Sequence, residues 1–109
     1  MKFEVFKGKN GQFYFSLYAK NGQKILASEG YASKDSCMKG IESVRKNAAS
    51  EDHFEVSTAS DGRMYFNLKS SNGQSVGKSQ MYKSRSGLKG GIESVKANAA
   101  DAPVVEREE

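Results

Sequence analysis

The sequence predicts an α+β protein in which a unit of three strands and one helix occurs twice and is followed by a last strand. The main observation is an internal repeat. When the chain is shifted against itself by 51 positions, roughly 21 of about 47 aligned residues are identical. The repeat is clearest in residues 40–49 and 91–100, which read GIESVRKNAA and GIESVKANAA. Alternating apolar residues and tight-turn pairs before each of these segments indicate the strands.

Three short segments of the first unit have the pattern of strands: residues 3–6, 12–18 and 24–28. Asn-Gly pairs, which favour the backbone conformations of tight hairpins, lie between them. In the middle segment Phe13, Phe15 and Leu17 share one side, because successive side chains of a strand point to opposite faces. We therefore expect an antiparallel meander that turns these three residues toward the core.

A helix is expected after each meander. In each unit the apolar residues recur at helical spacing and form one stripe: Cys37, Ile41, Val44 and Ala48, then Leu88, Ile92, Val95 and Ala99. Ser33 and Ser84 precede these stripes at the position of an N-cap, whose hydroxyl accepts a backbone N–H. Gly40 and Gly91 lie beside the stripes, although a mid-helix glycine costs about 1 kcal/mol relative to alanine. We expect the helix backbone to approach the sheet closely at both glycines.

The second unit repeats the plan, with Met64, Phe66 and Leu68 in place of the inward residues of the first. After the second helix, residues 104–107 have the pattern of one more strand, and Val105 aligns with Phe54 as a third copy of the first strand. A strand after each helix could pair with either half and so join the two. We expect one domain over residues 1–109, with repeats 1–51 and 52–109.

The chain resembles the YegP-like family. The resemblance covers nearly the whole chain and rests on the Asn10-Gly11 and Asn21-Gly22 turns, the Tyr31-x-Ser33-Lys34 helix entry, the Gly40–Val44 segment and their counterparts in the second copy. It implies two tandem β(3)-α-β repeats that form one antiparallel sheet with the C-terminal strands exchanged between the halves. We expect both helices on one face of this sheet. The family is one of unknown function, so the resemblance implies no activity and no catalytic residues.

The composition is that of a soluble globular protein, with 37% hydrophobic and 28% charged residues. No apolar run approaches the length of a transmembrane helix, and the chain leads directly into its first strand, so we expect a cytoplasmic protein without membrane association. The single cysteine, Cys37, agrees with a reducing compartment. The net charge of +4 permits weak binding to nucleic acid or another anionic surface.

The sequence contains no arrangement typical of an enzyme. Cys37 and His53 each occur once and are not duplicated, which favours a buried apolar thiol and a solvated strand end. Glu42 and Glu93 do recur, but each has Lys or Arg three residues later and is expected to form a surface pair. No metal-ligand spacing and no nucleotide-binding glycine loop is present. We expect no catalytic activity, no cofactor and no metal.

The first candidate site is the sheet face that the helices leave uncovered. Its aromatic and basic residues are Tyr14, Tyr18, Arg63, Tyr65 and Lys69. Rings interleaved with cations suit the stacking of single-stranded bases with the phosphates close to the charges. Two alternatives stand beside this hypothesis. Tyrosines are good strand formers on a half-exposed face, and together with Phe6 they could form an apolar patch through which two copies associate.

The second candidate site is the start of each helix, where Ser33 and Lys34 correspond to Ser84 and Arg85. Free N–H groups and the partial positive charge of a helix N-terminus favour phosphate or carboxylate. A plain N-cap with solvated cations is the alternative. The sequence therefore predicts a non-enzymatic binding module with nucleic acid or another anion as its candidate ligand, and a self-associating structural module as the alternative.

Overall fold

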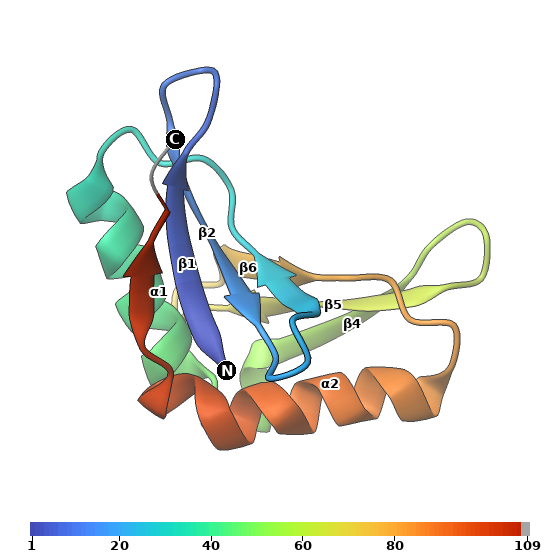
Figure 1. The fold of residues 1–109 in the computed structure, drawn as a ribbon. Coiled ribbons are helices and arrows are strands. Elements are labelled where there is room, and N and C mark those ends of the chain that lie inside the picture. Colours follow the sequence, from blue (N-terminus) through green and yellow to red (C-terminus); the bar gives the residue numbers. More distant parts are fainter. Residues whose placement is uncertain (108–109) are drawn as a thin grey trace.

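The computed structural model describes residues 1–107 and contains the strands and helices in the predicted order (Figure 1). The first half comprises β1 (Lys2–Lys7), β2 (Phe13–Tyr18), β3 (Lys24–Ala27) and α1 (Lys34–Asn47). The second half comprises β4 (Phe54–Thr58), β5 (Met64–Lys69), β6 (Ser75–Ser79) and α2 (Arg85–Asn98), followed by β7 (Val104–Glu106). One-turn 3-10 helices, Glu51–His53 and Ala99–Asp101, lie between each α-helix and the next strand. The predicted α+β class and tandem repeat are confirmed.

All strands belong to one seven-stranded sheet in the order β4-β5-β6-β3-β2-β1-β7. The halves join at the centre, where β3 and β6 run antiparallel with Leu26 opposite Ser79 and Ala27 opposite Lys78. We call this β3–β6 pair the seam. At one end of the sheet β7, which follows the second helix, pairs with β1 of the first half. The predicted exchange of the C-terminal strand is therefore confirmed, and Figure 1 shows β7 beside β1.

One feature of the predicted sheet is wrong: it is not antiparallel throughout. Five strand pairs are antiparallel, but β7 runs parallel to β1, with Phe3 opposite Val104. The repeat explains this direction. β7 follows α2 in the same way that β4 follows α1. In the first half, the strand that corresponds to β4 is β1, so β7 is expected to take the position and direction of β1. Because β1 already occupies that place beside β2, β7 lies outside it in the same direction.

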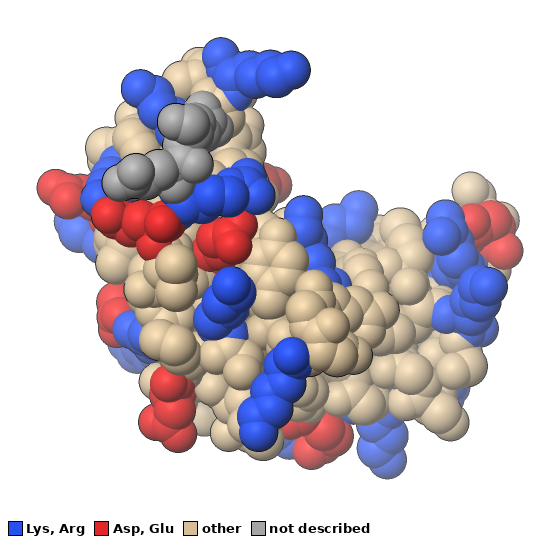
Figure 2. Space-filling view, in the orientation of Figure 1, with Lys and Arg blue, Asp and Glu red and all other residues tan. Residues whose placement is uncertain are grey.

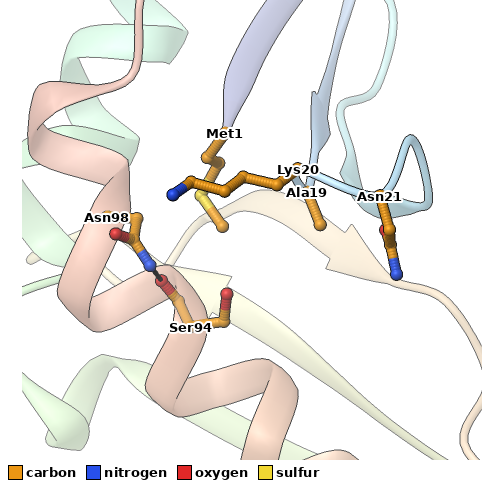
Figure 3. A pocket seen from close by; sticks show the side chains of 6 residues that line it. All are labelled: Met1, Ala19, Lys20, Asn21, Ser94 and Asn98. Atoms are coloured by element: carbon orange, nitrogen blue, oxygen red, sulfur yellow. Dashed lines mark hydrogen bonds between the residues drawn. The ribbon is translucent and has the colours of Figure 1, made fainter.

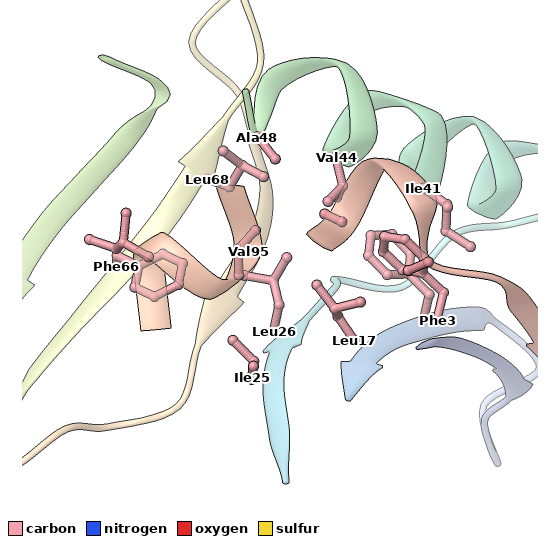
Figure 4. Close-up of a cluster of buried hydrophobic side chains, with 14 of the residues drawn as sticks. Phe3, Leu17, Ile25, Leu26, Ile41, Val44, Ala48, Phe66, Leu68 and Val95 are labelled. Atoms are coloured by element: carbon pink, nitrogen blue, oxygen red, sulfur yellow. The ribbon is translucent and has the colours of Figure 1, made fainter. Parts of the chain in front are cut away.

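The core lies between the helices and one face of the sheet (Figure 4). Phe15 and Leu17 of β2, like Phe66 and Leu68 of β5, are fully buried, as is Leu26 at the seam. The two predicted helical stripes are buried against these side chains. Phe13 and Met64, which we also expected to face inward, are only partly buried because they begin their strands at the rim of the core.

Both helices begin as predicted. The hydroxyl of Ser33 accepts the N–H of Ser36 at 3.1 Å, and that of Ser84 accepts the N–H of Gly87 at 3.0 Å. The predicted close approach at the two glycines is made mainly to tyrosine rings. A Cβ on Gly40 would lie 2.7 Å from Cζ of Tyr31, and the ring of Tyr31 stacks on Phe15 of the sheet. Tyr82 lies against Gly91 in the same way.

The two halves of the sheet run in clearly different directions, so that the β1–β2 and β4–β5 hairpins project from different sides of the molecule (Figure 1). This arrangement follows from the right-handed twist of strands, which accumulates across a sheet. Within residues 1–107, no helix is long and apolar enough to cross a membrane.

Candidate functional site

The side of the sheet away from the helices carries the first predicted site, and we call it the outer face. Residues opposite one another in the strand register share this face, and a row of them crosses the whole sheet: Glu55, Asn67, Lys78, Ala27, Ser16, Glu4 and Val105. By the same alternation, the three predicted tyrosines, Tyr14, Tyr18 and Tyr65, also lie on the outer face, and each is partly exposed. The structure thus places these rings on one face, as predicted.

Tyr14 belongs to a short stack at the β1–β2 end of the outer face. Its ring lies parallel to that of Phe6, with 5.6 Å between the centroids. The guanidinium of Arg107 lies 4.3 Å from the centroid of Phe6 and pairs with Glu4 at 3.1 Å. Asn10 donates a hydrogen bond of 2.9 Å to the Tyr14 hydroxyl. These contacts hold the ring in place, and the side that faces Phe6 is occupied.

The other two tyrosines have lysines as neighbours. Tyr18 lies between Lys2 of β1 and Lys24 of β3, which are opposite it in the register. The Nζ atom of Lys78 lies 4.6 Å from the centroid of the Tyr65 ring, a cation–π contact. Each of the three rings therefore has basic groups nearby on the same face.

Two of the predicted basic residues have acidic partners instead. Arg63 lies before the start of β5, in the β4–β5 turn, where its Nε donates to Asp61 at 2.7 Å. Lys69 lies on the outer face, 3.8 Å from Glu55. The aspartate carboxyl accepts both the backbone and the side-chain N–H of Arg63, which lowers the pKa of Asp61. Arg63 and Lys69 are therefore part of local ion pairs.

Sequence reasoning missed Lys78, the basic residue nearest the centre of the outer face. The repeat gave no signal for it because the equivalent residue in the first half is Ala27. Lys78 also lines a hollow of about 290 Å³ at the seam, together with Ala27, Asn67 and Ser75. In the space-filling view two lobes flank a saddle, with Lys and Arg on both lobes and beside the saddle (Figure 2). Acidic side chains gather mainly at the left, toward β7 and α1.

The helix entries, the second predicted site, are used within the fold. Ser33 and Ser84 cap their helices, so the N-cap alternative accounts for both serines. Lys34 forms an ion pair with Glu106 of β7 and thus ties the start of α1 to the exchanged strand. Arg85 begins α2 at the equivalent position of the second half.

A pair of equivalent hollows between the halves was also missed. One, of about 390 Å³, lies between the β2–β3 turn and α2 and includes Asn21, Ser94 and Asn98 (Figure 3). The other, of about 400 Å³, lies between the β5–β6 turn and α1 and includes the equivalent residues Asn72, Ser43 and Asn47. In both helices the asparagine amide donates to the serine carbonyl one turn earlier. The sequence signal for these hollows was the recurrence of the Ser-x-x-x-Asn pattern in both repeats. The side-chain hydrogen bonds give this recurrence a structural reason.

Cys37 and His53 have different environments. Cys37 is fully buried in the core, and this burial raises its pKa from an ordinary value of 9.0 to about 11. His53 is the last residue of the first 3-10 helix and is partly exposed. Within the described part of the chain, no three His, Cys, Asp or Glu side chains are grouped closely enough to hold a metal ion.

We expect Cys37 to react far more slowly with a thiol reagent at pH 8 in the native protein than in urea. The thiolate forms more readily in the unfolded chain, because the pKa of Cys37 is about 11 in the folded protein and 9.0 in the unfolded chain. The free energy of unfolding is therefore unaffected by this group below about pH 9 and falls as the pH rises toward 11. Denaturation at several pH values checks this, and the decline above pH 9 should be smaller in Cys37→Ala. A fast native reaction at pH 8 would contradict the expectation.

The fold and its repeats define the class of protein to which the chain is related. It consists of two tandem units that share one sheet, with a final strand exchanged from the second half to the first. The domain family described as "Domain of unknown function (DUF1508)" matches residues 9–55 and again residues 59–106. The chain belongs to this family.

Similar proteins confirm the resemblance to YegP. A UPF0339 protein of Pseudomonas aeruginosa is 50% identical over 101 residues, which is 93% of this chain and 92% of that protein. The solution NMR structure of YegP from Escherichia coli, a protein of unknown function, has a TM-score of 0.91 at 48% identity and covers 97% of this chain and 91% of that one. A UPF0339 protein of Shewanella oneidensis also has a TM-score of 0.91, at 41% identity over 96% and 89% of the two chains.

Proposed function

We propose that the protein is a non-enzymatic binding module whose outer face binds single-stranded nucleic acid weakly. The observation that carries this proposal is the pairing of exposed rings with cations on one face. Lys78 lies over Tyr65, and Lys2 and Lys24 flank Tyr18. A base can stack on the Tyr18 ring, and on the Tyr65 ring once the Lys78 ammonium group moves from the ring to the phosphate.

The energetics of such a face favour weak and sequence-tolerant binding. Stacking of a base on an aromatic side chain contributes about 1–3 kcal/mol, and every base offers a flat surface for it. Tyr14 offers one ring surface, because Phe6 occupies the other. Three separated rings can hold only a few bases.

The distribution of charge agrees with this ligand. Residues 1–50 contain nine Lys or Arg and four Asp or Glu, so the half that carries Tyr14 and Tyr18 is basic. Lysines that neutralise phosphates release counterions, and the affinity then falls as the salt concentration rises. Ion pairs at Arg63, at Lys69 and, with Glu4, at Lys2 reduce the contribution of these three residues. We therefore assign the main electrostatic role to Lys24 and Lys78.

We predict that a labelled, mixed-sequence, single-stranded oligonucleotide binds at low salt and is released at moderate salt, as measured by fluorescence anisotropy. Replacing Tyr14 and Tyr65 together with alanine should weaken binding by about tenfold or more, because two stacking surfaces are lost. Lys78→Ala should reduce the salt dependence by about one phosphate contact.

The matched control replaces the same two tyrosines with phenylalanine, which keeps the rings and removes only the hydroxyl groups. It should bind nearly as well as the natural protein. Circular dichroism would establish that all variants are folded. The proposal fails if the natural protein does not bind at low salt, or if the double alanine variant binds equally well.

A further inference from the structure

The two edges of the sheet differ although the repeat makes their strands equivalent. In the first half, β1 has β7 as its neighbour on the side away from β2. In the second half, β4, the counterpart of β1, is the last strand and has no neighbour on the side away from β5. The effect is clear at two aligned valines: Val5 of β1 is 3% exposed and Val56 of β4 is 45% exposed. The second half therefore lacks a strand that the first half has.

The contacts of β7 show what a strand needs at this position. Phe3 donates its N–H to the Pro103 carbonyl at 2.8 Å, and Arg107 donates its N–H to the Val5 carbonyl at 2.8 Å. The side chains add ion pairs and a further hydrogen bond: Lys34 with Glu106, Glu4 with Arg107, and Arg45 with the Ala102 carbonyl. β7 is thus held by its backbone, by one acidic residue and by one basic residue.

The repeat gives most of these groups a counterpart in the second half. Glu55 corresponds to Glu4, Arg85 to Lys34 and Lys96 to Arg45, whereas Ser57 replaces the ring of Phe6. Lys96 lies 4.0 Å from Glu51 and 3.7 Å from Glu93. The strand register is the same in both halves: Val56 lies opposite Phe66 as Val5 lies opposite Phe15. Because Val5 uses its carbonyl for β7, the carbonyl of Val56 points toward the open edge.

The sequence of β4 provides a second, independent observation. Natural edge strands are commonly protected against pairing by charged side chains, especially lysine, by proline, by a bulge or by very short length. β4 has five residues, FEVST, of which only Glu55 is charged; it has neither lysine nor proline, and its register with β5 contains no shift. An edge with so little protection and an exposed valine is suited to the addition of a strand.

We propose that the β4 edge binds an extended segment of a partner protein, parallel to β4, in the place that β7 takes beside β1. The segment would carry the pattern of residues 104–107: two apolar residues, then an acidic and a basic residue. Its acidic side chain would meet Arg85, its basic side chain would share Glu55 with Lys69, and its backbone would pair with Val56.

The charges favour such a segment over a second copy of this chain. In a second copy β7 is already paired with β1 and held by Lys34 and Glu4. The second copy would then offer its own β4, which contains Glu55 but no basic residue to meet the Glu55 of the first. A peptide with the β7 pattern supplies both charges.

The test uses a labelled synthetic peptide with the sequence of residues 101–107, DAPVVER, added to the full chain. We expect saturable binding in fluorescence anisotropy, and changes in the amide NMR signals of β4. Arg85→Glu should weaken binding at least about fivefold, because an attraction becomes a repulsion. A peptide with Glu106→Lys should recover binding to that variant.

Two variants locate the site. Val56→Pro removes an N–H on the open edge and should abolish binding. If Val56→Pro does not fold, the Arg85→Glu protein and the Glu106→Lys peptide still test the site. Lys34→Glu is the matched control, because it changes the β7 position instead and should leave peptide binding unchanged. Binding lost in Lys34→Glu but kept in Arg85→Glu would overturn the proposal, as would absence of binding. So would a dimer in sedimentation that Val56→Pro dissociates and the peptide does not affect.

Discussion

Replacing Leu26 with alanine is expected to lower the free energy of unfolding by about 3–5 kcal/mol. Leu26 is 0% exposed and lies in β3 at the seam, where the two halves of the sheet meet over only two residue pairs. Removing a fully buried leucine side chain leaves a cavity that the surrounding core fills only in part. Among residues 1–107, the only other strand pair that joins the halves within the sheet is β7 with β1, so the loss should destabilise both halves together.

Gly77 offers a sharper form of this experiment. A Cβ on Gly77 would lie 2.7 Å from Cγ of Leu26, so the leucine occupies the space above the glycine. Gly77→Ala alone should therefore destabilise the protein through overpacking, by about 1–3 kcal/mol. In the Leu26→Ala background the added methyl group enters the cavity, and the second substitution should cost much less or stabilise the protein.

Urea denaturation followed by circular dichroism measures all four members of this double-substitution cycle. We expect a favourable coupling of about 1–3 kcal/mol between the two changes. Additive effects would show that Leu26 and Gly77 do not share a packing site. Two separate unfolding transitions in Leu26→Ala would contradict the expectation that the seam joins the halves into one cooperative unit.

Much of the fold was predictable because its signals are local. Alternation placed Phe15 and Leu17 on the buried face, helical spacing placed Ile41 and Val44 in the core, and Ser33 caps its helix as expected. These features depend on a few neighbouring residues, so each can be read without knowledge of the partner segment.

The features that were missed depend on contacts between distant segments. The parallel direction of β7 follows from the place that β1 already holds, and a single strand pattern carries no direction. Lys78 meets Tyr65 only through the register of β6 with β5, which local patterns do not specify. The exposure of Val56 likewise requires knowledge of which edge lacks a neighbour, because Val56 and Val5 are identical in the repeat.

Gly91→Ala and Gly90→Ala are expected to have opposite effects on stability, although the two residues are adjacent in α2. A Cβ on Gly90 has no atom within 4 Å, so alanine there should stabilise the protein by about 0.5–1 kcal/mol through its higher helix propensity. A Cβ on Gly91 would lie 2.7 Å from Cζ of Tyr82. The rigid ring would have to move, and we expect a net loss of about 1–2 kcal/mol.

The Tyr82 hydroxyl provides the decisive control for this pair. It is the atom nearest to the position of a Gly91 Cβ, and it is buried without a hydrogen-bond partner among residues 1–107. Tyr82→Phe should therefore cost little or stabilise the protein, since an unpaired buried hydroxyl is lost. In that background Gly91→Ala should become less costly, while Gly90→Ala keeps its effect, and thermal melts of the six proteins would measure both changes. Equal effects at the two glycines would mean that helix propensity, rather than contact with Tyr82, decides stability at Gly91.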